Sequence, residues 1–399
     1  NTVAGKTLDL YQIFTATKNE AGNVAYTLNP EYKGFFQSKI TDASALTGEA
    51  LSEKAYDYVK KQVGPDGSNG AEFAKAILGW ILENDTTVAA THTTATTTDG
   101  STVISDLAYG YYVVYPLGAT DTSTAPGNEA VKSVASLVSV TGTDAKVNMK
   151  SNYPTVVKTV NDKVADDVNI GDTVTYTLTS KVPDMTGYTS YVFNFKDTLS
   201  AGLTFKEITS VTVGSGENVQ NVTAGTGDNT YTLTQDGQNI TITMNNFLAS
   251  NANKAGQEIK VTYTATLNKN AVTGFDANKN SATIEYSNKP GTDNKGESEP
   301  SIVDVHTFNF TIFKYYLKGA DKTGLANAEF ELYKGNTEDT AADENAKINI
   351  VDEGNGVYRQ ATADEAKATG FTSAKIVSDD DGKVLVKGLD AGTYYLRET

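Results

Sequence analysis

Hydrophobic and polar residues alternate along much of the chain beyond residue 150, which is the pattern of half-buried β-strands. In residues 173–179, apolar side chains at every second position alternate with threonines, and residues 259–267 repeat the pattern. Residues 231–233 and 240–242 flank an Asp-Gly pair, which is typical of a hairpin turn. Short alternating strands separated by turns predict a β-sandwich over residues 153–300.

The first section, residues 1–152, mixes two periodicities. Residues 8–14 and 110–115 resemble strands, whereas two intervening segments carry apolar residues at helical spacing. The residues that share a helix face are Leu51, Ala55, Tyr58 and Val59, and then Phe73, Ile77, Trp80 and Ile81. The threonine-rich segment 86–102 lacks either pattern and is expected to be a loop. We therefore expect an N-terminal domain of strands with added helices.

The third section, residues 301–399, again alternates, in segments 308–312, 330–333 and 384–386. The sequence stops at residues 394–399, which have the pattern of a strand with no turn after it. A sandwich that stopped there would leave a sheet edge open. We expect a third β domain that is truncated before its last strand.

Composition excludes several classes of protein. The 399 residues include no cysteine and two histidines, far apart, so thiolate chemistry, disulfides and a histidine metal site are not expected. The net charge of −16 disfavours binding to nucleic acid or to an anionic membrane. No apolar run is long enough to cross a bilayer. We expect neither a metal nor a cofactor.

Strand parity places three polar residues on inward faces of the second section. Lys158 shares a face with valines 156 and 160, Asp197 with phenylalanines 193 and 195, and Asn280 with the apolar residues 282, 284 and 286. In the third section, Lys314 and Glu398 also share apolar faces. Parity alone leaves open a buried salt bridge or a lysine that reaches water at a strand end.

A family resemblance favours a covalent interpretation. Residues 394–399, YYLRET, match the E-box (YxLxET) of Gram-positive pilins with Cna B-type domains, and residues 325–332 resemble the second strand of that domain. The segment 197–204, DTLSAGLT, resembles a motif of the middle domain of such pilins. The resemblance implies a mainly β chain of tandem immunoglobulin-like sandwiches of the Cna A and Cna B types.

The resemblance also implies the roles of particular residues. Lys158 and Asn280 would form an intramolecular isopeptide bond assisted by Asp197. Lys314 would be the donor in the third section, with Glu398 promoting the reaction and an acceptor asparagine that this sequence does not contain. In the first section, Tyr115 stands where an E-box glutamate would stand, so no isopeptide bond is expected there, although Lys6 is a candidate donor.

Lys150 is the residue that a sortase would join to the next subunit, although its surroundings depart from the family's YPKN motif and a solvated linker lysine is an equal alternative.

The chemistry of isopeptide formation suits a buried lysine, asparagine and carboxyl group. Burial lowers the pKa of a lysine and raises that of a carboxyl group, so that a neutral amine can attack an asparagine carbonyl carbon beside a proton donor. Such a reaction occurs once per molecule and is not enzymatic turnover.

The sequence thus predicts a structural subunit of a cell-wall-anchored, extracellular pilus, whose partners are neighbouring pilin subunits, a pilin-specific sortase and a host surface ligand. Two alternatives stay open. One is an adhesin or tip pilin of the same architecture that is not polymerised through a lysine. The other is a secreted enzyme with accessory sandwich domains.

Overall fold

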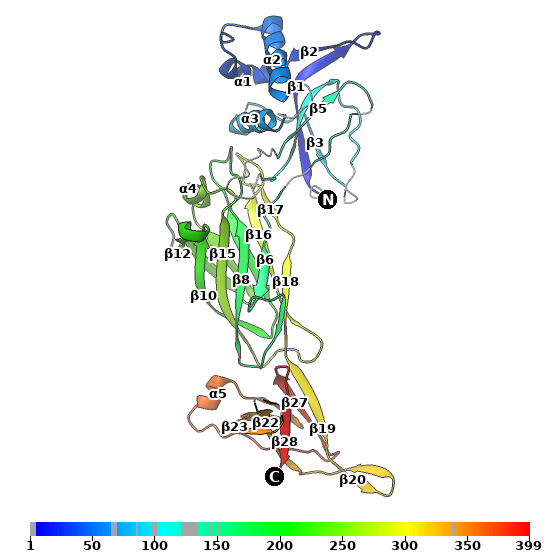
Figure 1. The fold of residues 1–399 in the computed structure, drawn as a ribbon, viewed down its shortest axis with the longest axis vertical. Coiled ribbons are helices and arrows are strands. Elements are labelled where there is room, and N and C mark those ends of the chain that lie inside the picture. Colours follow the sequence, from blue (N-terminus) through cyan, green and yellow to red (C-terminus); the bar gives the residue numbers. More distant parts are fainter. Residues whose placement is uncertain are drawn as a thin grey trace.

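The computed structural model describes residues 5–64, 70–84, 87–97, 102–120, 134–143, 145–149, 152–336, 338 and 340–399. The molecule is elongated, with three sections stacked end to end and the chain termini in the first and third sections (Figure 1). Strands dominate, and the longest helices lie in the first section. The prediction of a mainly β chain with helices added at its N-terminal end is confirmed. No helix in these described ranges is long and apolar enough to span a membrane.

The first section is a sheet with helices packed on one face. Its strand order is β2 (Val24–Leu28), β1 (Thr7–Lys18), β4 (Gly110–Pro116) and β5 (Ser136–Val140), and β3 (His92–Ala95) also pairs with β1. The helical elements are η1 (Pro30–Tyr32), α1 (Lys33–Lys39), α2 (Gly48–Val63) and α3 (Gly70–Glu83).

Both helix predictions in this section are confirmed, because α2 and α3 bury the faces identified from spacing, with Tyr58 and Trp80 only partly covered. The expectation of a loop over residues 86–102 is wrong for His92–Ala95. That strand lacks an apolar alternation and is held instead by its ladder with β1 and by a hydrogen bond from Thr93 to the buried Asp9. Residues 85, 86 and 98–101 of this neighbourhood lie outside the described residues.

The middle section is a sandwich of two sheets. One has the order β11-β10-β15-β8-β6, and the other has the order β12-β13-β14-β9-β16-β18-β7, with β17 on β16. The first sheet comprises β6 (Val157–Val160), β8 (Thr173–Lys181), β10 (Leu203–Val213), β11 (Gln220–Asn221) and β15 (Glu258–Leu267). The second comprises β7 (Ala165–Asp167), β9 (Phe193–Leu199), β12 (Thr223–Ala224), β13 (Thr230–Asp236), β14 (Asn239–Met244), β16 (Asn278–Ser287), β17 (Lys295–Glu297) and β18 (Ser301–His306).

The alternation read from the sequence fixes the core of this sandwich. Val174, Tyr176 and Leu178 of β8 are fully buried between the sheets, while the intervening threonines face outward or lie partly exposed. Two short helical elements, η2 (Gly216–Asn218) and α4 (Phe247–Asn251), complete the section. Strand β18, which the sequence prediction assigns to the third section, pairs with β16 in this sandwich.

The third section is a smaller two-sheet domain. One sheet has the order β19 (Phe308–Phe313), β27 (Lys383–Leu389), β25 (Val357–Gln360) and β24 (Ile350–Gly354). In the other, β22 (Glu329–Gly335) pairs with β23 (Ala342–Lys347), β26 (Ile376–Val377) and β28 (Tyr394–Glu398). The hairpin β20 (Tyr315–Lys318) and β21 (Asp321–Gly324) projects from the domain (Figure 1), and the short helix α5 (Ala363–Lys367) follows β25 in the chain.

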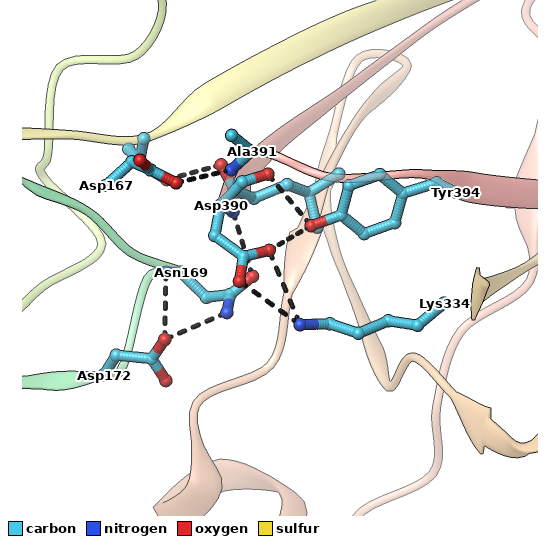
Figure 2. A network of polar contacts seen from close by, with 9 residues as sticks. Asp167, Asn169, Asp172, Lys334, Asp390, Ala391 and Tyr394 are labelled. Carbon is cyan, nitrogen blue, oxygen red and sulfur yellow. Dashed lines mark hydrogen bonds and ion pairs between the residues drawn. The ribbon is translucent and has the colours of Figure 1, made fainter. Parts of the chain in front are cut away.

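Backbone contacts join the middle and third sections directly. The Ile170 amide donates to the Gly388 carbonyl at 3.0 Å, and a Cβ at Gly388 would meet the Ile170 side chain at 2.6 Å. Figure 2 shows the adjoining polar network, in which the amides of Asp390 and Ala391 donate to Asn169 and Asp167. A glycine is needed at position 388 for this close approach and for its positive φ.

The first and middle sections also pack closely. Gly187 lies against Leu82 of α3, where a Cβ would approach the leucine Cβ to 2.4 Å. Two ion pairs also cross this junction. The Nζ of Lys75 in the first section lies 3.9 Å from a carboxylate oxygen of Asp184 in the middle section, and the Nζ of Lys289 in the middle section lies 3.9 Å from a carboxylate oxygen of Asp9 in the first. The three sections therefore form a chain of packed junctions rather than independent domains on open linkers.

Candidate functional site

The middle sandwich brings four polar side chains together between its two sheets. Lys158 on β6 and Tyr263 on β15 come from one sheet, while Asp197 on β9 and Asn280 on β16 come from the other. Each projects inward because it occupies an inward position of its strand's alternation. The three residues singled out from strand parity thus meet at one point in the core, and Tyr263 joins them.

Lys158 is the centre of this cluster. Its Nζ donates to Asn280 Oδ1 at 2.8 Å and to the Tyr263 hydroxyl oxygen at 2.9 Å, and it also forms a short ion pair with Asp197 Oδ2. The Tyr263 hydroxyl donates to the same Asp197 oxygen at 2.9 Å, and Asn280 Nδ2 donates to Tyr263 at 2.7 Å. The amine therefore lies within hydrogen-bond distance of the amide that it would attack.

The cluster is sealed from solvent. The side chains of Lys158 and Asp197 are 0% exposed, and Asn280 and Tyr263 are fully buried. Burial lowers the pKa of Lys158 to about 8, against the opposing attraction of Asp197. Burial also raises the pKa of Asp197, although Lys158 and Tyr263 partly offset this effect. Both shifts favour the neutral forms, an amine and a carboxylic acid.

Two tyrosine rings flank the amine. The Lys158 Nζ lies 5.0 Å from the ring centroid of Tyr176 and 5.3 Å from that of Tyr263, and the two rings stack at 5.2 Å. The rings stabilise the ammonium form by cation–π attraction and exclude water from the site. Sequence reasoning missed Tyr263 as a site residue. Its alternation predicts an inward side chain, but the partner of its hydroxyl depends on the packing of the opposite sheet.

The second predicted pair lies in a different environment. Lys314 Nζ is 2.5 Å from Glu398 Oε2, so the two residues do meet. The prediction that both point into the core is wrong, however, because the Lys314 side chain is 29% exposed and that of Glu398 is 52% exposed. Glu398 lies at the end of β28, which pairs with β22 on one side only among the described strands. Solvent reaches a pair at such an edge, so its electrostatic stabilisation is small.

The remaining predicted residues fall elsewhere. Lys150 lies outside the described residues. Lys6 directly precedes β1, with its Nζ 4.8 Å from the ring centroid of Tyr153, and Tyr115 is buried on β4. No group of three or more histidine, aspartate or glutamate side chains in the described ranges has a metal-binding arrangement.

Comparison with known proteins agrees with this architecture. Residues 170–290 match the family described as Gram-positive pilin backbone subunit 2, Cna-B-like domain, and residues 314–399 match a prealbumin-like fold domain. No curated protein matches the sequence significantly. Among solved structures, the T6 backbone pilin of serotype M6 Streptococcus pyogenes is 17% identical, with a TM-score of 0.51 over 99% of this chain and 74% of that chain.

Two further structures are similar at lower scores. The full-length major pilin RrgB of Streptococcus pneumoniae is 16% identical over 99% of this chain and 85% of its own, with a TM-score of 0.47. The full-length major pilin SpaD of Corynebacterium diphtheriae is 19% identical over 100% and 80%, with a TM-score of 0.45.

The fold and the family matches define a class of protein, tandem Cna-B-like and prealbumin-like domains. Within that class, residues 170–290 match the Gram-positive pilin backbone family and residues 314–399 match the prealbumin-like family, so the middle and third sections have the domain types of such pilins. The resemblance read from the E-box and the middle-domain segment is thereby confirmed.

The buried lysine predicts a characteristic pH dependence in a chain that cannot react. Burial lowers the pKa of Lys158 to about 8 in the folded chain, against an ordinary value of 10.5, and because the amine stays buried in an Asn280→Ala variant, it should lose its proton at a lower pH when folded than when unfolded. The unfolded state then binds more protons between these values, so the free energy of unfolding should rise with pH in that window.

Thermal unfolding of Asn280→Ala and of Asn280→Ala with Lys158→Met, from pH 7 to 10.5, measures this effect. The single variant should gain stability relative to the double variant as pH rises above 8. Parallel curves would show that the pKa of Lys158 is not lowered.

Proposed function

We propose that the chain is the structural subunit of a covalently polymerised surface pilus, and that an isopeptide bond between Lys158 and Asn280 stabilises its middle domain. The observation that carries this proposal is the sealed contact of a lysine amine with an asparagine side chain beside Asp197. A purely structural ion pair would not need the amide, and burying an ion pair seldom stabilises a fold.

The reaction begins with proton transfer from Lys158 to Asp197, which burial favours. The neutral Nζ then attacks Cγ of Asn280, the Nζ–Cγ bond forms, and the Cγ–Nδ2 bond breaks to release ammonia. Nζ loses one proton and Nδ2 gains one, so Asp197 is protonated at the start and at the end of this exchange. The fold holds the groups together and so supplies the high effective concentration that an amide-forming step requires.

The bond would join the two sheets of the sandwich. Lys158 lies on the edge strand β6 of one sheet, and Asn280 lies on β16 inside the other. A covalent tie between sheets would resist a pulling force that separates them, which suits a subunit of a fibre. We also propose that a sortase links Lys150 to the neighbouring subunit. The resulting fibre would be anchored to the cell wall and would bind a ligand on the host surface.

Intact mass tests the cross-link directly. The folded chain should weigh less than its sequence by one ammonia, about 17 Da. Lys158→Met and Asn280→Ala should each restore the full mass of the variant sequence. Lys196→Met is the matched control, because that lysine neighbours Asp197 but is 42% exposed and lies near Glu285 and Glu297. An unchanged mass in the parent chain contradicts the proposal.

The cross-link should also stabilise the middle domain. Lys158 and Asn280 are 122 positions apart, and closing a loop of that length lowers the entropy of the unfolded chain by an amount worth about 5 kcal/mol. Asn280→Ala should therefore unfold at a clearly lower denaturant concentration than the parent chain. Equal denaturation midpoints in guanidinium chloride would show that no loop has been closed.

The role of Lys150 is tested in a cell that assembles the pilus. Lys150→Ala should abolish the ladder of high-mass polymer seen after denaturing electrophoresis, because the acceptor amine is lost. Lys146→Ala, which changes an exposed lysine four positions away, should leave the ladder intact. A ladder that persists in Lys150→Ala would favour an adhesin or tip subunit, or polymerisation through another lysine.

A further inference from the structure

We propose that the Tyr263 hydroxyl is a catalytic group of the isopeptide reaction, carrying a proton from Asp197 to the leaving nitrogen of Asn280. The inference rests on the proposed cross-link and adds a fourth participant to its chemistry. It assigns to Tyr263 the step that releases ammonia.

The contacts of one oxygen atom carry the proposal. The Tyr263 hydroxyl lies 2.9 Å from Lys158 Nζ, 2.9 Å from Asp197 Oδ2 and 2.7 Å from Asn280 Nδ2. It therefore touches the nucleophile, the acid and the leaving group. The cluster is fully buried, so bulk water does not reach these groups.

Asp197 does not reach the leaving group by itself. Among the described residues, its Oδ2 is hydrogen-bonded to Lys158 and Tyr263, and its Oδ1 has no hydrogen-bond partner. No hydrogen bond joins Asp197 to Asn280 there. Two hydrogen bonds connect Asp197 to Asn280 Nδ2, and both are made by the Tyr263 hydroxyl oxygen.

Proton transfer along this path leaves every group with the proton count that the reaction requires. After Nζ attacks Cγ, the tetrahedral intermediate has a positively charged Nζ and an Nδ2 with a free lone pair. The Tyr263 hydroxyl gives its proton to Nδ2 and takes one from Asp197, and Asp197 takes one from Nζ. The Cγ–Nδ2 bond then breaks, ammonia leaves, and both Tyr263 and Asp197 end in the protonated states in which they began.

A tyrosine suits a relay that must not hold a charge. Burial and the nearby Asp197 raise the pKa of Tyr263 well above its ordinary value. The hydroxyl therefore stays protonated and passes a proton on only as it receives another. General acid catalysis of this kind contributes about a hundredfold or more to a rate.

Tyr176 provides the matched control. Its ring stacks on Tyr263 and lies equally close to the amine, and it is as deeply buried. Its hydroxyl is near Asn280 but makes no hydrogen bond of normal geometry in the described part of the chain. Replacement by phenylalanine therefore removes a hydroxyl from either ring, but interrupts the path from Asp197 to Nδ2 only at Tyr263.

The experiment follows bond formation over time. Full chains made by cell-free translation are quenched in acid at intervals, and the fraction that has lost one ammonia is measured by intact mass. Tyr263→Phe should slow the loss at least tenfold, whereas Tyr176→Phe should stay within about threefold of the parent rate. Equal rates for the two variants would overturn the role of Tyr263.

Two further readouts separate the remaining outcomes. If the parent chain never loses ammonia, the isopeptide reaction itself is refuted, and the role of Tyr263 falls with it. In an Asn280→Ala background, where no bond forms, Tyr263→Phe should lower the melting temperature only modestly, because it removes the hydrogen bonds of one buried hydroxyl. A large fall there would assign the hydroxyl a structural role and would also overturn the proposal.

Discussion

Burial of the Lys158 amine between two apolar sheets is the constraint on which the middle domain depends. A buried ammonium group costs several kcal/mol unless partners compensate for the lost hydration. The sandwich supplies a carboxyl, an amide and a hydroxyl from three different strands, together with two aromatic rings. Formation of the amide bond would remove the positive charge of Lys158 and the free energy of burying it. This would explain why the core retains a lysine where an apolar residue would be less costly to bury.

The same constraint links chemistry to architecture. The reacting groups come from opposite sheets, so they meet only after the sandwich has closed, and the bond would then fix the closed state. The flanking junctions continue this pattern of close packing. Gly187 against Leu82 on one side, and Gly388 against Ile170 on the other, allow backbone to approach side chain directly. An elongated molecule with such junctions is suited to transmit force along its length.

Strand parity recovered most of the site from the sequence, because the two-residue period of a strand fixes which side chains face the core. That rule placed Lys158, Asp197 and Asn280 inward without any knowledge of the sheet order. It could not place the Tyr263 hydroxyl in the cluster, because its partners belong to strands of the other sheet or to the sheet edge. Parity also did not reveal that Glu398 is exposed, since exposure at an edge depends on which strands cover it.

The prediction of a loop around His92–Ala95 was wrong for a related reason. A short strand without apolar alternation is defined by the strand beside it, here β1, and not by its own sequence. The family motifs added what periodicity cannot supply, a proposed chemical role for the inward residues, and the match of residues 170–290 to a backbone pilin family agrees with the resemblance on which that proposal rests.

Tandem mass spectrometry of a tryptic digest tests the proposed bond between Lys158 and Asn280 most directly, because it identifies which two residues are cross-linked. Trypsin does not cleave after an acylated lysine or before proline, so a cross-linked chain should yield one branched peptide joining residues 151–163 to residues 280–295. Fragment ions should place the branch at Lys158 and Asn280, with the loss of one ammonia. Recovery of a peptide ending at Lys158 and of an unmodified peptide 280–295, without the branched species, would contradict the account.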